Sequence, residues 1–412
     1  MSATTRVLTS LAAGALIGLL LVGWNPALAL QVANVAQPIG KLWLNALQMT
    51  VVPLVLALVV VGVNTASDAA ASGRIARRAI VVFIVILTGG AVFAALAAPL
   101  VFSLFPHNPA LVAALDHASV PSLAQVAPVN WVDTLTAIVP SNAIMAAAQS
   151  AMLPLVVFAL FLGFALTRLA PERRALLLEF FQAIADAMIV IVRWVLWVAP
   201  LGVFALILSV CARSGLSMLS ALGVYVLVEC LLYLAVTVTM LPVAMIFGGE
   251  RLRRFALGLV PAQVVAISTQ SSLASLPAML ESADRRLGYP KQVAALVLPM
   301  AVSLFRLTSP VQYVTSAVFI AWAYGIDLST AQLLAGAMLA VVISLGSVGL
   351  PGQVTFIATN LPVAQAMGLP LSPLGLMLAV DTIPDALATL GNVTADMTAT
   401  SVVSRQSRRT IA

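Results

Sequence analysis

Charged residues are scarce in this sequence. Asp, Glu, Lys and Arg make up 8% of the 412 residues, whereas soluble domains contain about 25%. Cysteine is nearly absent: Cys211 and Cys230 both stand in apolar surroundings, which argues against a disulfide framework or a metal site. What is abundant is hydrophobic residues, at 62%, with a mean hydropathy of +1.10. The composition excludes a soluble domain and indicates a multi-pass membrane protein.

The basic residues are grouped along the chain. The formal net charge is +6, and sixteen of the twenty Lys and Arg residues fall in six clusters, at Arg6, 74–78, 168–174, 251–254, 285–291 and 405–409. All neighbouring clusters but one pair are separated by enough apolar chain to cross a bilayer and return, at about 20 residues per crossing. Because basic residues favour the cytoplasmic side, we expect both termini in the cytoplasm and the protein in the cell inner membrane. The positions of the basic residues therefore indicate the membrane topology of the chain and do not indicate nucleic-acid binding.

The apolar segments predict an all-α membrane protein with eight transmembrane helices and two re-entrant helical hairpins. The second helix is expected to end in a polar turn at 64–68, and an outer loop at 106–133 holds His107 and His117 as solvated residues. The predicted transmembrane segments are 7–22, 42–63, 79–105, 134–167 with a break near 140–142, 184–209, 221–247, 292–324 with a break near 305–310, and 374–403.

Two segments have the wrong length for simple crossings. Residues 255–280 lie between basic clusters that are too close together for two crossings, and their centre at 268–277 is rich in serine. We therefore expect a hairpin that enters and leaves on the cytoplasmic side, with protein or water around its tip. Residues 328–380 contain no charged residue and are too long for one helix, which predicts a second hairpin from outside. Interrupted units of opposite orientation indicate inverted repeats around a midplane site in a secondary transporter.

The last apolar helix carries polar residues on one face. Asp381, Asp385, Thr389, Asn392 and Asp396 follow one another at spacings of four, four, three and four, which places them on one helical stripe. An unpaired carboxylate in hydrocarbon is costly, so this stripe is expected to face the bundle interior or a wet cavity. Pro384 removes a backbone donor and is expected to kink the helix. Two further charged residues in predicted spans, Glu229 and Arg193, are expected to serve structural pairing or to lie at an interface more than to bind substrate.

Three motifs resemble one family. They are Met-Thr-Val-Val-Pro-Leu-Val at 49–55, Ala-Pro-Leu-Gly-Val-Phe-Ala-Leu at 199–206, and Asn-Val-Thr-Ala-Asp at 392–396, where Ala395 replaces the family's glycine. With them the chain resembles the dicarboxylate/amino acid:cation symporters, which include the glutamate and aspartate transporters, over nearly its whole length. The resemblance implies a homotrimer working by an elevator motion. It implies scaffold helices in 1–75 and 106–215, a transport domain from 76–105 and 216–404, and a basic cytoplasmic tail at 405–412.

The resemblance also implies the site residues. Ser271 and Ser272 match serines at the first hairpin tip that contact substrate, and Gly349, Pro351 and Gly352 match the gate of the second. Asp385 matches the aspartate that holds a substrate amino group, Asn392 the asparagine at its carboxylate, and Asp396 a sodium ligand. Arg306, Thr389 and Ser309, which keeps a hydroxyl, complete the expected substrate site. Asp381 and Asp396 are the expected cation or proton residues.

The chain departs from the family motif at the cation sites. The family's Asn-Met-Asp-Gly-Thr becomes Phe-Arg-Leu-Thr-Ser at 305–309, so Phe305 and Leu307 stand where an Asn and an Asp serve cations. The arginine that grips an acidic side chain is replaced by Ala388, and the first-tip arginine of archaeal members by Gln270. We hypothesise that Arg306 stands where sodium would sit and neutralises Asp396. The competing use is that Arg306 binds a substrate carboxylate.

The departures from the family motif lead to an expected function. We expect a symporter for a small amino acid or a dicarboxylate, with no organic cofactor and a weakened sodium site. Asp381 and Asp385 stand one turn apart, where like charges repel, so a shared proton is a candidate coupling ion; a structural role for Asp381 is an equal alternative. A cation-independent exchanger or facilitator of dicarboxylates, with Arg306 on the substrate, is the second reading. An enzyme is not expected, because no His-Glu-x-x-His stretch occurs and neither histidine lies in a predicted span.

Overall fold

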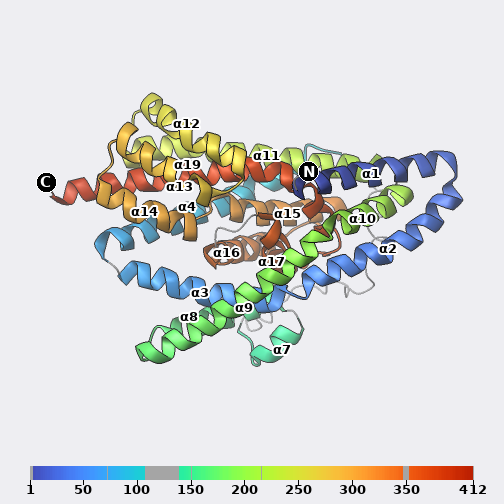
Figure 1. Cartoon of the computed structure of the whole chain (residues 1–412), viewed down its shortest axis with the longest axis horizontal. Coiled ribbons are helices and arrows are strands. Elements are labelled where there is room, and N and C mark those ends of the chain that lie inside the picture. Colours follow the sequence, from blue (N-terminus) through green and yellow to red (C-terminus); the bar gives the residue numbers. More distant parts are fainter. Residues whose placement is uncertain are drawn as a thin grey trace.

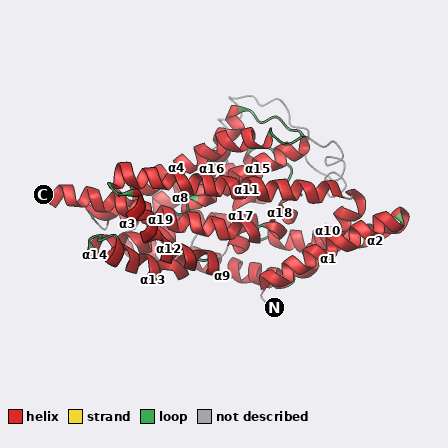
Figure 2. Ribbon diagram, turned by 90° about the horizontal axis from the view of Figure 1, so that it is seen from above, coloured by secondary structure: helices red, strands yellow, loops and turns green. Residues whose placement is uncertain are grey.

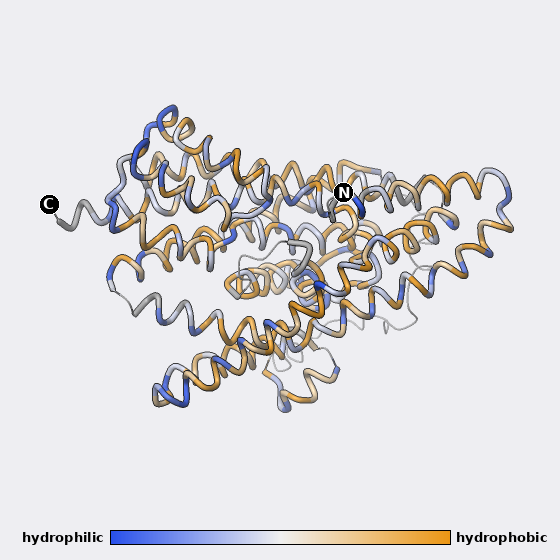
Figure 3. The backbone as a smooth tube through the Cα atoms, viewed as in Figure 1, coloured by the Kyte–Doolittle hydropathy of each residue, from blue (hydrophilic) through white to orange (hydrophobic). Residues whose placement is uncertain are grey.

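The computed structural model describes residues 3–71, 73–106, 139–149, 151–214, 216–346 and 352–411. Within these ranges the chain is helical and contains no strand, which confirms the predicted all-α class. The helices form an elongated bundle with the C-terminus at one end and the turn between the first two helices at the other (Figure 1; Figure 2 gives the view from above). The turns at both ends are hydrophilic, and apolar helices run between them (Figure 3).

The first half of the chain contains eight described helices. Their bounds are α1 (Ala3–Trp24), α2 (Pro26–Gln48), α3 (Val51–Ala71), α4 (Arg74–Phe102), α7 (Ala143–Ala148), α8 (Met152–Leu166), α9 (Pro171–Trp197) and α10 (Ala199–Ser214).

The second half contains the interrupted segments. Its bounds are α11 (Leu216–Val243), the π-helical η1 (Ala244–Gly248), α12 (Leu252–Thr269), α13 (Ser272–Glu281), η2 (Ser282–Arg286), α14 (Lys291–Leu304), α15 (Thr308–Tyr324), α16 (Thr330–Gly346), α17 (Gly352–Ala366), α18 (Leu374–Val380) and α19 (Thr382–Ile411).

Length and apolar composition identify the segments able to cross a membrane. Five described helical segments qualify, or six if the bent pair α18–α19 counts as one. The five are Pro26–Thr65, Arg74–Phe102, Pro171–Trp197, Ser220–Gly248 and Lys291–Tyr324. The predicted count of eight crossings stays a prediction.

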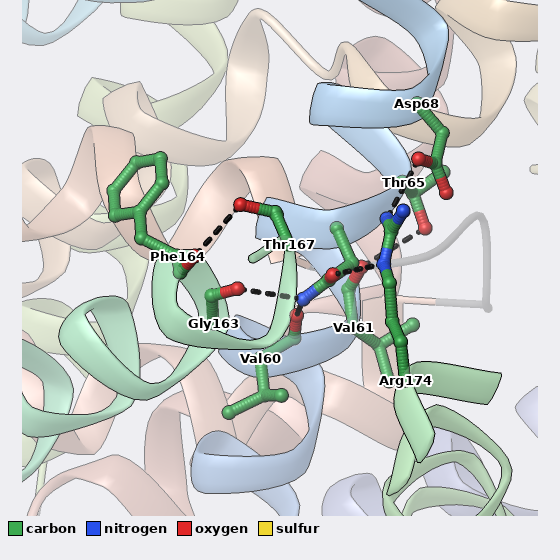
Figure 4. A network of polar contacts seen from close by, with 9 residues as sticks. Val60, Val61, Thr65, Asp68, Gly163, Phe164, Thr167 and Arg174 are labelled. Carbon is green, nitrogen blue, oxygen red and sulfur yellow. Dashed lines mark hydrogen bonds and ion pairs between the residues drawn. The ribbon is translucent and has the colours of Figure 1, made fainter. Parts of the chain in front are cut away.

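The predicted polar turn at 64–68 is wrong, because α3 continues through it to Ala71. Its polar side chains make contacts with neighbouring helices. The amide of Asn64 donates to the carbonyl oxygen of Gly163 on α8 at 3.0 Å, and Arg174 of α9 donates to Asn64 at 3.1 Å and to Asp68 at 2.6 Å (Figure 4). The polar residues at 64–68, which resemble a turn in the sequence, therefore form a helical face that connects α3 to α8 and α9.

Close packing joins α10 to α1 and α2. The indole of buried Trp43 on α2 lies over Gly202 of α10, where an added Cβ would come within 2.3 Å of the ring. The indole nitrogen of Trp43 donates to the carbonyl oxygen of Val195 on α9 at 3.1 Å, which satisfies its one polar group.

The final helix α19 runs through the most densely surrounded part of the bundle. It packs against α4, α11, α12, α14 and α15. The preceding helix α18 meets it at an angle of 72°, with Asp381 at the break. The predicted kink at Pro384 is found: this residue lies in the first turn of α19, directly after the bend, and has no N–H to bond to the carbonyl oxygen of Val380. The stripe of five polar residues therefore begins at the bend with Asp381, and its other four members lie on α19.

Two helical hairpins approach this region. In the first, α12 and α13 pack on each other and are joined by a short turn at residues 270–271. In the second, α16 packs on α17, and the connection at 347–351, which includes the predicted gate residues Gly349 and Pro351, lies outside the described residues. Gly352 begins α17.

Candidate functional site

The helix interruption predicted at 305–310 is present at 305–307, between α14 and α15, and residues 308–310 already belong to α15. Phe305 has φ −127° and ψ 106°, which ends α14. The carbonyl oxygen of Arg306 then accepts from the backbone N–H of Ser309 at 3.0 Å and from the hydroxyl of Ser344, near the end of α16, at 3.3 Å. The second hairpin thus contacts the break that carries Arg306.

Asn392 holds the start of α15. Its side-chain oxygen accepts from the backbone N–H of Thr308 at 3.0 Å and from the hydroxyl of Thr308 at 2.9 Å. The first N–H groups of a helix have no partner within the helix, so this amide caps α15. The amide nitrogen of Asn392 is buried and makes no hydrogen bond within the described residues. That N–H₂ group is free to donate to a bound molecule.

The tip of the first hairpin reaches the bend between α18 and α19. Gln270 has φ 51°, the one left-handed conformation at a non-glycine residue in the described ranges, and its amide donates to the carbonyl oxygen of Thr382 at 3.2 Å. The hydroxyl of Ser271 caps α13 by accepting from the N–H of Ala274 at 3.3 Å. Ser272 follows and is buried. The structure therefore places the two predicted tip serines directly after Gln270, Ser271 in the turn and Ser272 as the first residue of α13.

Four carboxyl groups are buried around the two breaks. Asp381 and Asp396 are fully buried, and Asp385 is 7% exposed. The fourth is Glu229 of α11, also fully buried, which accepts from the hydroxyl of Tyr233 at 2.9 Å. Glu229 lies close enough to Asp381 and Asp385 for electrostatic interaction with both.

Gln312 of α15 sits within this group of acids. Its amide nitrogen donates to Oδ1 of Asp381 at 2.7 Å, and its side chain also lies beside Glu229. Oδ2 of Asp381 and Oε2 of Glu229 are buried and have no hydrogen-bond partner among the described residues. Glu229 was not among the predicted site residues. Its position in the middle of an apolar span indicated that it needs a partner, but the sequence did not show which acids it would contact.

Arg306 is the positive charge of the region. Its guanidinium attracts the carboxyl groups of three residues, Asp381, Asp385 and Asp396. Both oxygens of Asp396 are buried without a hydrogen-bond partner in the described part of the chain. Arg306 is therefore not hydrogen-bonded to Asp396 as a dedicated pair, and its field is shared by the three aspartates.

Apolar side chains fill the places where the family motif has an Asn and an Asp. The ring of Phe305 stacks on that of Phe83 in α4, with centroids 4.8 Å apart and planes 5° from parallel. Leu307 is fully buried and packs against Gly90 of α4, where an added Cβ would come within 2.7 Å of its side chain. Neither position offers an oxygen side chain to a cation.

The remaining predicted residues are also buried. Ser309 lies in the first turn of α15, and the hydroxyl of Thr389 donates to the carbonyl oxygen of Asp385 at 2.9 Å. His107 and His117 lie outside the described residues. Within the described ranges, no group of three His, Cys, Asp or Glu side chains is placed to hold a metal ion.

Comparison with known proteins gives one consistent result. The sequence profile of the Sodium:dicarboxylate symporter family matches residues 3–406. The proton/sodium-glutamate symport protein of Geobacillus stearothermophilus is 29% identical over 97% of this chain and 93% of its own length. The proton/glutamate-aspartate symporter of Escherichia coli strain K12 is 29% identical over 97% and 92%.

The name of a mammalian relative gives a different substrate class. The neutral amino acid transporter B(0) of Oryctolagus cuniculus is 32% identical over 93% of this chain and 76% of its own length. The relatives and the profile are those of membrane transporters, and the match covers the breaks, the hairpins and the polar helix described above. The chain belongs to the sodium:dicarboxylate symporter family.

Proposed function

We propose that this protein is a secondary active symporter for a small amino acid or a dicarboxylate. The observation that supports it most is the meeting of the first hairpin tip with the bend at Asp381, beside the buried carboxyl groups of Asp385 and Glu229. The second helix break carries Arg306, whose charge acts on these aspartates and on Asp396. Broken helices at the centre of a bundle offer unpaired backbone groups and charges to a substrate and a coupling ion. The printed names of the relatives, which are glutamate symporters and neutral amino acid transporters, agree with this substrate class.

The coupling ion in this proposal is a proton. Glu229, Asp381 and Asp385 lie together in the interior with one nearby arginine, and burying several unbalanced negative charges is costly. A proton on this group reduces that cost. The orphaned oxygens of Glu229 and Asp381 provide places for it. The set of side-chain ligands for sodium is correspondingly poor, because Phe305 and Leu307 are apolar.

Arg306 acts against sodium in the same proposal. A fixed positive charge opposes a cation at the same spot by about 4 kcal/mol at a separation of ~4 Å and an effective dielectric constant of 20. We expect substrate uptake into proteoliposomes to proceed at equal rates in sodium and choline buffers and to be driven by an inward proton gradient. Strict sodium dependence would contradict the proposal, as would uptake that is unchanged when the pH gradient is collapsed.

Asp385 is proposed to hold the substrate amino group. Asp385→Asn should abolish uptake of an amino acid, whereas the control Asp327→Asn, an exposed carboxylate between α15 and α16, should leave uptake unchanged. Ala388 removes the family's arginine for an acidic side chain, so a neutral amino acid is the first substrate to test. Equal losses in both variants would remove the argument for Asp385.

A second function rests on Arg306. The guanidinium of Arg306 attracts three aspartates and makes no hydrogen bond to Asp396. If it binds a substrate carboxylate, the protein would exchange or facilitate dicarboxylates without a cation. Dicarboxylate flux that survives Asp385→Asn and is lost in Arg306→Gln would favour this function. The opposite pattern favours the amino acid symporter.

The larger assembly is also proposed from the family. Segments 1–75 and 106–215 form the scaffold of a homotrimer. Segments 76–105 and 216–404 move as an elevator in the inner membrane, with cytoplasmic termini. Cross-linking of the detergent-solubilised protein should give a trimer as the largest abundant species, and a monomer at all cross-linker concentrations would contradict it.

A further inference from the structure

A polar cavity lies at the end of the bundle nearest the C-terminus, away from the carboxyl groups described above. Its volume is about 550 Å³. Its walls come from η1, the start of α12, the loop before α14, and α19. The lining residues are Gly248, Gly249, Glu250, Arg251, Arg254, Leu287, Tyr289, Ser401, Ser404 and Arg405.

Positive charge dominates this cavity. Arg251, Arg254 and Arg405 line it from two segments that are far apart in sequence, and Glu250 is the one lining carboxylate. With three positive charges and one negative charge, the lining carries a formal charge of +2. A guanidinium offers five N–H donors in a planar fork that matches the oxygens of a phosphate group. The lining is therefore suited to an oxyanion.

Two of the arginines are held in place. The side chain of Arg254 donates to the carbonyl oxygens of Leu287 at 2.8 Å and Arg286 at 3.3 Å. Arg405 donates to the carbonyl oxygen of Ile246 at 2.7 Å. These bonds use some of the donors and orient the guanidinium groups, which lowers the entropy cost of binding a ligand with the remaining donors.

Gly249 allows Arg405 to approach the turn. It has φ +73°, which favours glycine, and an added Cβ would lie 3.1 Å from Nε of Arg405. Any other residue at this position would push against the arginine side chain. The turn before α12 is therefore shaped to admit the guanidinium.

One buried hydroxyl group in the cavity wall lacks a partner. Ser404 is 2% exposed, and its hydroxyl makes no hydrogen bond within the described residues. The hydroxyl of Tyr289 is also buried, and it lies beside Glu250 and Ser401; burial, and after it Glu250, raises the pKa of Tyr289, so this hydroxyl stays neutral. Buried polar groups in proteins are nearly always satisfied, so the orphaned donor of Ser404 points to a ligand.

The start of α12 adds a third kind of donor. Arg251 is the N-cap residue, and no side chain caps the first N–H groups of this 18-residue helix. The N-terminus of a helix carries a partial positive charge and open N–H groups, which suit an anion. Helix end, arginines and hydroxyls thus lie around one cavity.

We propose that this cavity binds a phosphate group, held by Arg251, Arg254 and Arg405 with hydroxyl donation from Ser404. The phosphate can come from a phospholipid headgroup or from a soluble phosphorylated molecule. A lipid is the favoured source, because Met245, Ile246 and Phe247 beside the cavity are apolar and exposed, as expected where a helix meets acyl chains. Such a ligand ties α12 to α19.

The test compares full-length variants in detergent and in nanodiscs. In detergent, thermal unfolding is measured with inorganic phosphate against chloride at matched ionic strength. In nanodiscs, it is measured with anionic phosphatidylglycerol against phosphatidylcholine, in which the choline group offsets the charge of the phosphate. Arg251→Gln removes a lining charge that makes no hydrogen bond among those described, and Arg405→Gln removes a second one. Arg253→Gln is the control, because it removes the same charge from the same turn without lining the cavity.

The expected result is stabilisation of the wild type and of Arg253→Gln by at least one of the two phosphate sources, with at least a tenfold weaker half-saturation in Arg251→Gln and Arg405→Gln. An effect of phosphatidylglycerol alone identifies a lipid, and an effect of inorganic phosphate identifies a soluble ligand. No stabilisation by either source, or equal stabilisation of all four proteins, overturns the proposal. Should Arg405→Gln fail to fold, Arg251→Gln decides the outcome alone.

Discussion

The hydrogen bond between Gln312 and Asp381 gives the sharpest prediction. The bond is 2.7 Å long and is the one described for this carboxyl group, whose other oxygen has no partner. Gln312→Leu keeps the volume of the side chain and removes the donor. A hydrogen bond to a charged group contributes about 1.5–3 kcal/mol. We therefore expect the free energy of unfolding to fall by about that amount, or roughly one to two powers of ten in the folding equilibrium.

The assay is reversible unfolding in mixed micelles, followed by the fluorescence of the six tryptophans. Gln263→Leu is the matched control, because Gln263 donates at 3.0 Å to the neutral hydroxyl of Thr394 on the same helix as Asp385. Loss of a neutral bond should cost about 0.5–1.5 kcal/mol. A double-mutant cycle with Asp381→Asn should give a coupling energy of about 1 kcal/mol or more.

The reasoning fails if Gln312→Leu costs no more than Gln263→Leu, or if the cycle gives a coupling energy near zero. The pH dependence offers a second check. Where Asp381 carries the shared proton, the bond is a neutral one, and the difference between the two variants should be near zero. The difference should grow at a pH high enough to ionise Asp381, and a difference that is constant with pH would show that no carboxylate is involved.

Two further predictions concern packing, and the same unfolding assay measures both. Phe305→Ala and Phe83→Ala should each cost about 3–5 kcal/mol, with about 0.5–1.5 kcal/mol of coupling between the stacked rings; additive losses would show that the stack contributes nothing of its own. Gly202→Ala should cost about 1–3 kcal/mol, because its Cβ would meet the ring of Trp43 at 2.3 Å. Gly223→Ala, with open space around it, should not destabilise; equal effects at both glycines would remove the steric argument.

The sequence was informative where a local rule was broken. The extended chain at 305–307 follows from polar residues and a proline inside an apolar run, and the turn at 270–271 follows from serines between basic clusters. Both breaks are where they were predicted, because helix interruption is decided by nearby residues. The family of the chain was likewise predictable from its motifs.

The sequence did not predict features that depend on contacts between residues far apart in the chain. Pro384 marked the bend at Asp381, but neither the angle of the bend nor its contact with Gln270 of the first hairpin was readable from the sequence. The polar residues at 64–68 read as a turn because their partners on α8 and α9 are about 100 positions away. The place of Glu229 among the aspartates has the same cause. Such contacts depend on tertiary packing that a linear pattern does not contain.

The stacked rings of Phe83 and Phe305 have a mechanical consequence. Together with Leu307 against Gly90, they fasten the extended chain that bears Arg306 to the side of α4 at two successive points. Sliding the chain that bears Arg306 along α4 would separate the two rings and open voids in a close-packed interior. Any displacement that carries the guanidinium must therefore take α4 along as part of the same rigid body.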